Sequence, residues 1–98
     1  MKKYYIAVCV PSASGGWRAV FPDAPDCDAD GSTLDRAVFH AASALAGYAA
    51  RLNGTAVQVL QAPRDLTTIR ADQNWEAANK IDWSAAVITM IPLSLNDA

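Results

Sequence analysis

The first thirty residues carry apolar runs separated by turn-forming residues, a pattern that predicts three β-strands. Residues 3–10 (KYYIAVCV) are rich in β-branched and aromatic side chains and leave both faces of the strand apolar, which is typical of a central strand. A Gly-Gly pair then favours a hairpin that returns into a second strand, residues 17–22. Pro22 ends that strand because proline has no backbone N–H. The acidic residues 26–30 are predicted to form a short third strand at the edge of the sheet.

The next stretch changes to the period of an α-helix. Residues 33–53 repeat apolar side chains every three or four positions, Ser32 can accept a hydrogen bond from the first helical N–H groups, and Asn53-Gly54 is a typical helix end. The apolar stripe of this helix is predicted to lie on the sheet. Its outer side carries Phe39 among alanines, and small residues let another element approach closely, so we hypothesise a subunit or partner contact there. An ordinary alanine-rich surface helix is the equally supported alternative.

The rest of the chain contains shorter segments. Residues 55–60 predict either a strand or an extended linker. Residues 63–71 and 74–80 predict two short helices, the first beginning with a proline. Residues 85–91 (AAVITMI) are the clearest remaining strand, and Pro92 is predicted to end it.

The order of these elements predicts an α/β (α+β) domain. Three antiparallel strands, a long helix and a further strand make a β-β-β-α-β arrangement. A strand reached through a helix usually enters parallel to its neighbour by a right-handed crossover. Placing the last strand beside the first gives the sheet order 3-2-1-4 in a two-layer sandwich, with the helix across one face. The other face is left uncovered, which predicts a homodimer or a higher homo-oligomer.

Composition and charge narrow the class of protein. The chain has 98 residues, of which 52% are hydrophobic, enough for one domain over residues 1–98 and too few for two. A net charge of −2 with scattered basic residues argues against broad nucleic-acid binding. No signal peptide and no stretch apolar enough to cross a bilayer is found in the sequence, so we predict a cytoplasmic protein with reduced cysteines and no membrane partner.

Aspartates gather around the proline bend and form the first candidate site: Asp23, Asp26, Asp28 and Asp30. The segment DCDADG begins with the spacing of a calcium-binding loop. Such a loop needs a glutamate at its twelfth position, where this chain has Ala37. Calcium binding is therefore not predicted, and the sequence points to no metal and no cofactor.

The predicted sheet order is also that of ribonuclease H, whose chemistry needs carboxylates that converge on two metal ions. Such a site requires an acid on the central strands, and neither residues 4–10 nor residues 85–91 contain one. An RNase H-like metal-dependent nuclease is thus the alternative that the pattern does not favour. His40 is interpreted as a helix surface residue, and Cys9 and Cys27 as small buried hydrophobes.

Several of these motifs together resemble the HicB-type antitoxins of bacterial type II toxin–antitoxin systems. The resemblance rests on the opening KYYIAV strand, the WRAVFPDAPDC corner, the DGSTLDRA helix start, the PRDLTTIRA segment and the closing apolar strand. It covers nearly the whole chain, and the corner with the helix start is its most specific part. Asp26 stands where the family usually has glycine.

The resemblance implies a partial RNase H-like fold without nuclease chemistry. Its implied partner is a small basic HicA-type messenger-RNA interferase, which the antitoxin masks. An acidic corner suits such a partner, so we predict that Asp23, Asp26, Asp28 and Asp30, together with Phe39, contact it. Many family members also carry a C-terminal DNA-binding segment. This sequence ends at Ala98, soon after the last predicted strand, so we expect no DNA-binding domain. A self-assembling accessory domain without a toxin partner is the remaining alternative.

Overall fold

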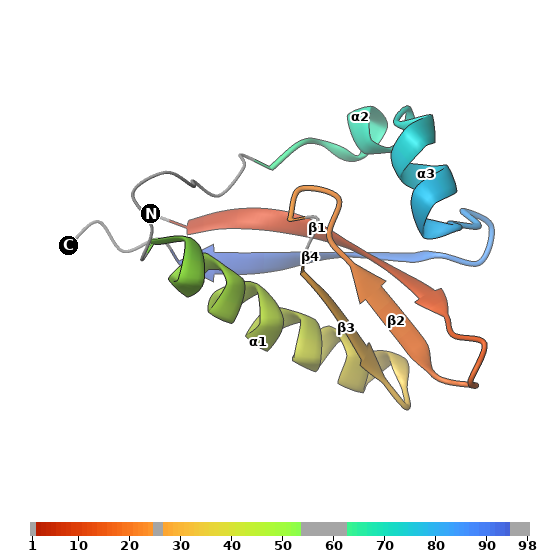
Figure 1. Cartoon of the computed structure of the whole chain (residues 1–98), viewed down its shortest axis with the longest axis horizontal. Coiled ribbons are helices and arrows are strands. Elements are labelled where there is room, and N and C mark those ends of the chain that lie inside the picture. The colour runs from red at the N-terminus through yellow and green to blue at the C-terminus, as the bar shows by residue number, and fades with distance from the viewer. Residues whose placement is uncertain (1, 25–26, 54–62, 95–98) are drawn as a thin grey trace.

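A computed structural model describes residues 2–24, 27–53 and 63–94. Within these residues the chain forms one four-stranded sheet, with a long helix on one side and two short helices on the other (Figure 1). The strand order is β3-β2-β1-β4. In chain order the elements are β1 (Lys2–Pro11), β2 (Trp17–Val20), β3 (Asp28–Gly31), α1 (Leu34–Asn53), α2 (Leu66–Arg70), α3 (Gln73–Asn79) and β4 (Val87–Ser94).

The mixed α/β class and the sheet order 3-2-1-4 are confirmed, but the predicted parallel entry of the last strand is wrong. β4 pairs antiparallel with β1, with Lys2 opposite Ser94 and Cys9 opposite Val87. The reason is the path of the chain after α1. Residues 63–79 run back along the sheet, and β4 therefore starts from the end of the sheet opposite to the end of α1 (Figure 1).

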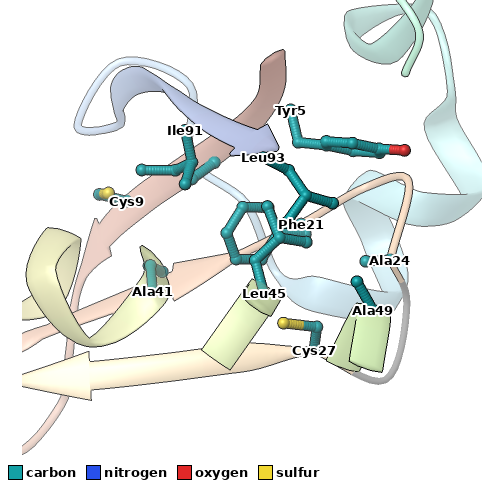
Figure 2. Packing of buried hydrophobic residues seen from close by; sticks show 12 residues of the cluster. Tyr5, Cys9, Phe21, Ala24, Cys27, Ala41, Leu45, Ala49, Ile91 and Leu93 are labelled. Carbon is teal, nitrogen blue, oxygen red and sulfur yellow. The ribbon is translucent and has the colours of Figure 1, made fainter. Parts of the chain in front are cut away.

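The helix α1 covers one face of the sheet and forms the larger part of the core. The β1 side chains that point to it, Tyr5 among them, cluster with Phe21 from the corner and Leu45 from the helix (Figure 2). Ala37 and Ala41 on α1 have no exposed surface, so small side chains bring the helix close to the strands. The long apolar stripe predicted for this helix therefore lies on the sheet as expected.

The opposite face of the sheet is also covered over part of its area, which corrects the prediction of a face left open. Val8 and the other alternate residues of β1 form a second buried cluster with Ile69 from α2 and Ile81 from the loop after α3. Trp75 and Trp83 pack against this cluster, with ring centroids 6.1 Å apart. The two short helices were predicted, but their position on this face follows from apolar residues too few and too dispersed to form a sequence pattern.

Most element ends differ from the predictions by one to three residues, as at β2, which ends at Val20 before the predicted Pro22, and two of the differences have a clear physical cause. The side chain of Thr33, rather than Ser32, caps α1, because its Oγ1 accepts a hydrogen bond of 3.2 Å from the backbone N–H of Arg36. β4 continues through Pro92 instead of ending there. Proline is tolerated in this position because β4 is an edge strand that pairs with β1 alone. A missing N–H on its outer side removes no hydrogen bond of the sheet.

The segment 55–60, predicted as a strand or linker, lies outside the described residues. None of the helices in the described ranges combines the length and apolarity that crossing a bilayer would require.

Candidate partner-binding surface

The proline bend after β2 folds as a tight corner. The N–H of Ala24 donates to the carbonyl of Phe21 at 3.2 Å, and the N–H of Cys27 donates to the carbonyl of Ala24 at 2.9 Å. Phe21 and Ala24 are both buried in the core under α1. This corner carries the first two of the predicted acidic site residues. Asp26 lies outside the described residues, so the structure says nothing of its side chain.

Asp23 does not lie on the surface, in contrast to the exposed acidic corner that the sequence predicts. Its side chain is only 2% exposed and pairs with Arg64, the residue before the N-cap of α2. One carboxylate oxygen accepts from the Arg64 backbone N–H at 2.6 Å and the other from its Nε at 2.5 Å. The guanidinium also donates to the carbonyl of Pro22 at 3.3 Å and to Asp72 at 3.4 Å.

The Asp23–Arg64 pair therefore joins the corner to the segment that carries α2 and α3. The Asp23 hydrogen bond is the main cause that raises the pKa of Arg64 above its ordinary value, while partial burial opposes it. Two acids that follow Arg64 on its own segment, Asp65 and Asp72, cap α2 and α3. Their pKa values are lowered, chiefly because each accepts a hydrogen bond from a backbone N–H. Asp23 thus holds two parts of the fold together.

Asp28 and Asp30, the other two predicted acids, are exposed on β3. They alternate with Ala29, so both side chains lie on the sheet face that α2 and α3 share. Arg18 lies directly opposite Asp30 on β2, yet its guanidinium donates to the carbonyl of Asn79 at the end of α3, at 2.7 Å. The two carboxylates therefore lie exposed on the outermost strand of the sheet.

Phe39 is the most exposed large apolar side chain of the described residues, with 70% of its surface accessible. Its ring lies 5.9 Å from that of His40, and His40 Nδ1 is 2.8 Å from the carbonyl oxygen of Asp30. The histidine therefore links α1 to the outer edge of β3. We call the region formed by Asp28, Asp30, Phe39 and His40 the β3-edge surface.

The structure brings Asp28, Asp30 and Phe39 to the same edge of the sheet, with the two acids on the face shared with α2 and α3 and the ring on the side of α1. The role of His40 is not visible in the sequence, where it was interpreted as a simple surface residue. Its contact depends on how α1 crosses β3, and neither the helical period nor the strand alternation encodes that crossing. Its position ten residues after Asp30, in the second turn of the helix that follows β3, is the only hint.

A cleft of about 470 Å³ opens beside the β3-edge surface. The turn between β1 and β2 forms one wall with Ser12 and Ser14, whose hydroxyl oxygens are 2.9 Å apart, and Trp17 and His40 contribute to the lining. The walls offer hydroxyl and backbone groups and one imidazole. Asp30 and His40 are the ionisable residues of this lining.

The described residues contain no group of three or more His, Cys, Asp or Glu side chains placed to hold a metal ion. Both cysteines are buried free thiols. Burial is the main cause that raises the pKa of Cys27 to about 11, with the Asp28 charge adding to it and Arg51 opposing it, and burial also raises the pKa of Cys9. Neither thiol has the lowered pKa of a reactive nucleophile.

No protein-family model and no curated protein matches the sequence. Among solved structures, the chain is similar to the crystal structure of the N-terminal domain of the antitoxin HicB of Burkholderia pseudomallei, with a TM-score of 0.71. The similarity covers 97% of this chain and 100% of that domain, at 19% sequence identity. The chain therefore has the fold of the HicB N-terminal domain, which confirms the resemblance to this domain at the level of the fold.

Proposed function

We propose that this protein is a non-enzymatic binding protein of the antitoxin type, which neutralises a small basic HicA-type toxin by masking it. The observation that carries the proposal is a fold shared with a HicB antitoxin domain over nearly the whole chain, together with exposed acids on β3 and an exposed aromatic ring on α1. Masking needs shape and charge complementarity and no chemical step.

The β3-edge surface provides both kinds of contact. Asp28 and Asp30 supply negative charge that speeds encounter with a basic partner and fixes its orientation. Phe39 supplies an apolar ring that a partner pocket can bury, as aromatic anchors do at the centre of many interfaces. His40 holds the helix and the strand in register between these two contacts.

The direct test is co-expression with the neighbouring open reading frame. The expected result is a stable complex with a small basic protein and rescue of growth from its toxicity. Failure to associate with that protein, combined with failure to rescue, would refute the proposal.

The charge contribution is tested with Asp28→Asn and Asp30→Asn. Each substitution removes one negative charge from the β3-edge surface, so the association rate with the basic partner should fall and become less sensitive to salt. Asp65→Asn is the matched control. It makes the same charge change at an exposed N-cap, where asparagine caps as well as aspartate. Equal effects of all three variants would mean that β3 is not the contact.

The nuclease alternative has a separate assay. Purified protein is incubated with RNA and DNA substrates in the presence of magnesium or manganese, and the expected result is no cleavage above that of an Asp28→Ala variant. Metal-dependent cleavage that disappears in the variant would replace the masking proposal with an enzymatic one.

A further inference from the structure

The two edge strands of the sheet, β3 and β4, differ in how well they are protected against pairing with another strand. β3 carries Asp28 and Asp30, and the carbonyl of Asp30 is already in contact with His40 at 2.8 Å. A second strand added along β3 would have to displace the histidine, and a copy of the same strand would bring like charges together. Both features protect this edge against pairing with another β3.

β4, at the opposite edge, lacks such charges, and its one edge-protecting residue is Pro92, close to its C-terminal end. Its eight residues, VITMIPLS, include no charged side chain, and no other described strand pairs with its outer side. Val87 is 37% exposed and Met90 58% exposed, and Tyr4 on the neighbouring strand is 49% exposed. A long, uncharged and apolar edge strand is a ready template for another strand.

The alternation of the β1–β4 ladder indicates which backbone groups of β4 face outward. Opposed residues in an antiparallel pair alternate between hydrogen-bonded and non-bonded pairs. Pro92, opposite Tyr4, has no N–H to donate and so fits a non-bonded pair. Met90 and Ile88, two and four residues before Pro92, are then also in non-bonded pairs with β1. Their N–H and C=O groups therefore point away from β1. The outward carbonyl of Asp30 on β3 agrees with this alternation continued across the sheet.

We propose that β4 is a self-association edge, through which two copies of the chain pair antiparallel about a two-fold axis at Thr89. In this register the outward groups of Ile88 in one copy meet those of Met90 in the other, and the reverse pair completes the symmetric contact. The proline-free part of the strand, residues 87–91, is centred on Thr89, so the pairing needs no N–H from Pro92. The second copy is favoured as the occupant because the donors and acceptors of this segment are complementary to themselves and the segment carries no charge that would repel its own copy.

The proposed contact lies on the opposite edge of the sheet from the β3-edge surface, and the masking of a toxin does not depend on it. The pairing would join two four-stranded sheets into one continuous sheet. It would also cover Val87 and Met90, the exposed apolar side chains of β4.

A cysteine at the axis tests the register. Thr89 and Thr89 of the partner subunit would form a non-bonded pair with Cα atoms about 4.5 Å apart, a separation that a disulfide can bridge. We expect Thr89→Cys to form a covalent dimer under mild oxidation. Cys9 and Cys27 are buried and should not contribute. The matched control is Ala42→Cys, exposed on the outer face of α1, which also reports on the rival subunit contact there. Cross-linking of Thr89→Cys no faster than that of Ala42→Cys would overturn the proposal.

A second pair of variants tests the hydrogen bonds without a cross-link. Met90→Pro removes an N–H that faces away from β1, at the same parity as the native Pro92, whereas Met90→Val keeps that N–H. By light scattering over a micromolar concentration series, the wild type and Met90→Val should show dimers and Met90→Pro only monomers. A monomeric wild type, or a dimeric and folded Met90→Pro, would overturn the proposal. If Met90→Pro does not fold, as judged by circular dichroism, the cysteine experiment decides. If a folded, monomeric Met90→Pro variant still binds the toxin, self-association through β4 and the proposed masking function are independent of each other.

Discussion

Replacing Arg64 by methionine should destabilise the protein more than replacing Asp23 by asparagine, although Asp23 is the more deeply buried partner of the pair. The difference follows from what each substitution leaves behind. Arg64→Met leaves a carboxylate that is 2% exposed without the guanidinium that now donates to Oδ1, although the backbone N–H at position 64 still donates to Oδ2. Asp23→Asn leaves a guanidinium that is 28% exposed and still within reach of Asp72 and the carbonyl of Pro22.

The expected magnitudes follow from this geometry. Removing one partner of a buried ion pair costs about 3–5 kcal/mol, and because water reaches part of Arg64 we expect the lower end, about 3 kcal/mol, for Arg64→Met. Asp23→Asn keeps one oxygen as an acceptor for the backbone N–H of Arg64, so the expected cost is about 1–2 kcal/mol. For a domain of this size each kcal/mol lowers Tm by about 4–8 °C.

Urea unfolding followed by tryptophan fluorescence measures both variants, because Trp75 and Trp83 lie on the segment that Arg64 tethers and Trp17 reports on the sheet. Arg70→Met is the matched control. It makes the same substitution on α2, where the guanidinium is exposed and stacks over the Trp83 ring at 5.3 Å, and it should cost less than about 1 kcal/mol. If Arg64→Met costs no more than Arg70→Met, or less than Asp23→Asn, the assignment of Asp23 as a buried anchor is wrong.

Three further predictions concern packing, pH and the partner surface. Gly31→Ala should lower the free energy of unfolding by about 1–3 kcal/mol, because a Cβ there would lie 2.5 Å from the backbone nitrogen of Ala37; a thermal melt unchanged from wild type would contradict this. The free energy of unfolding should fall as pH rises from about 9 to about 11, since folding raises the pKa of Cys27 from 9.0 to about 11 and the folded state therefore favours the protonated thiol. The fall should be smaller in Cys27→Ala, and an identical pH profile in the two proteins would rule out this origin. Phe39→Ala should leave Tm unchanged within error, because the ring is 70% exposed, yet weaken toxin binding at least several-fold; a loss of stability without a loss of binding would argue against an interface role.

The elements that repeat a simple period were predictable from sequence. α1 keeps its apolar stripe over 20 residues, and β1 is apolar on both faces, so each matches one pattern only. The direction of β4 was not predictable, because it depends on where α2 and α3 take the chain. Their anchor on the sheet is a cluster that includes single residues such as Ile69 and Ile81, which produce no periodic signal.

The candidate site was predictable only in part, for a related reason. Asp23 was grouped with its acidic neighbours in sequence. Its partner Arg64 is 41 residues away, and in this pair the Asp23 side chain is buried. Asp28 and Asp30 were correctly expected on an edge strand, since strand alternation and charge both indicate a solvated position. The contact between His40 and Asp30 arises from the crossing of helix and strand, which a one-dimensional pattern does not specify.

The close approach of α1 to the sheet has a consequence for how this sequence can diverge. The helix backbone at Ala37 nearly touches the strand at Gly31, and Ala41, one turn further along α1, is also fully buried. A larger side chain at one of these positions fits only if a neighbour becomes smaller or the helix shifts outward. Substitutions in homologues should therefore occur in compensating pairs at these three positions, while the exposed acids on β3 vary independently of them.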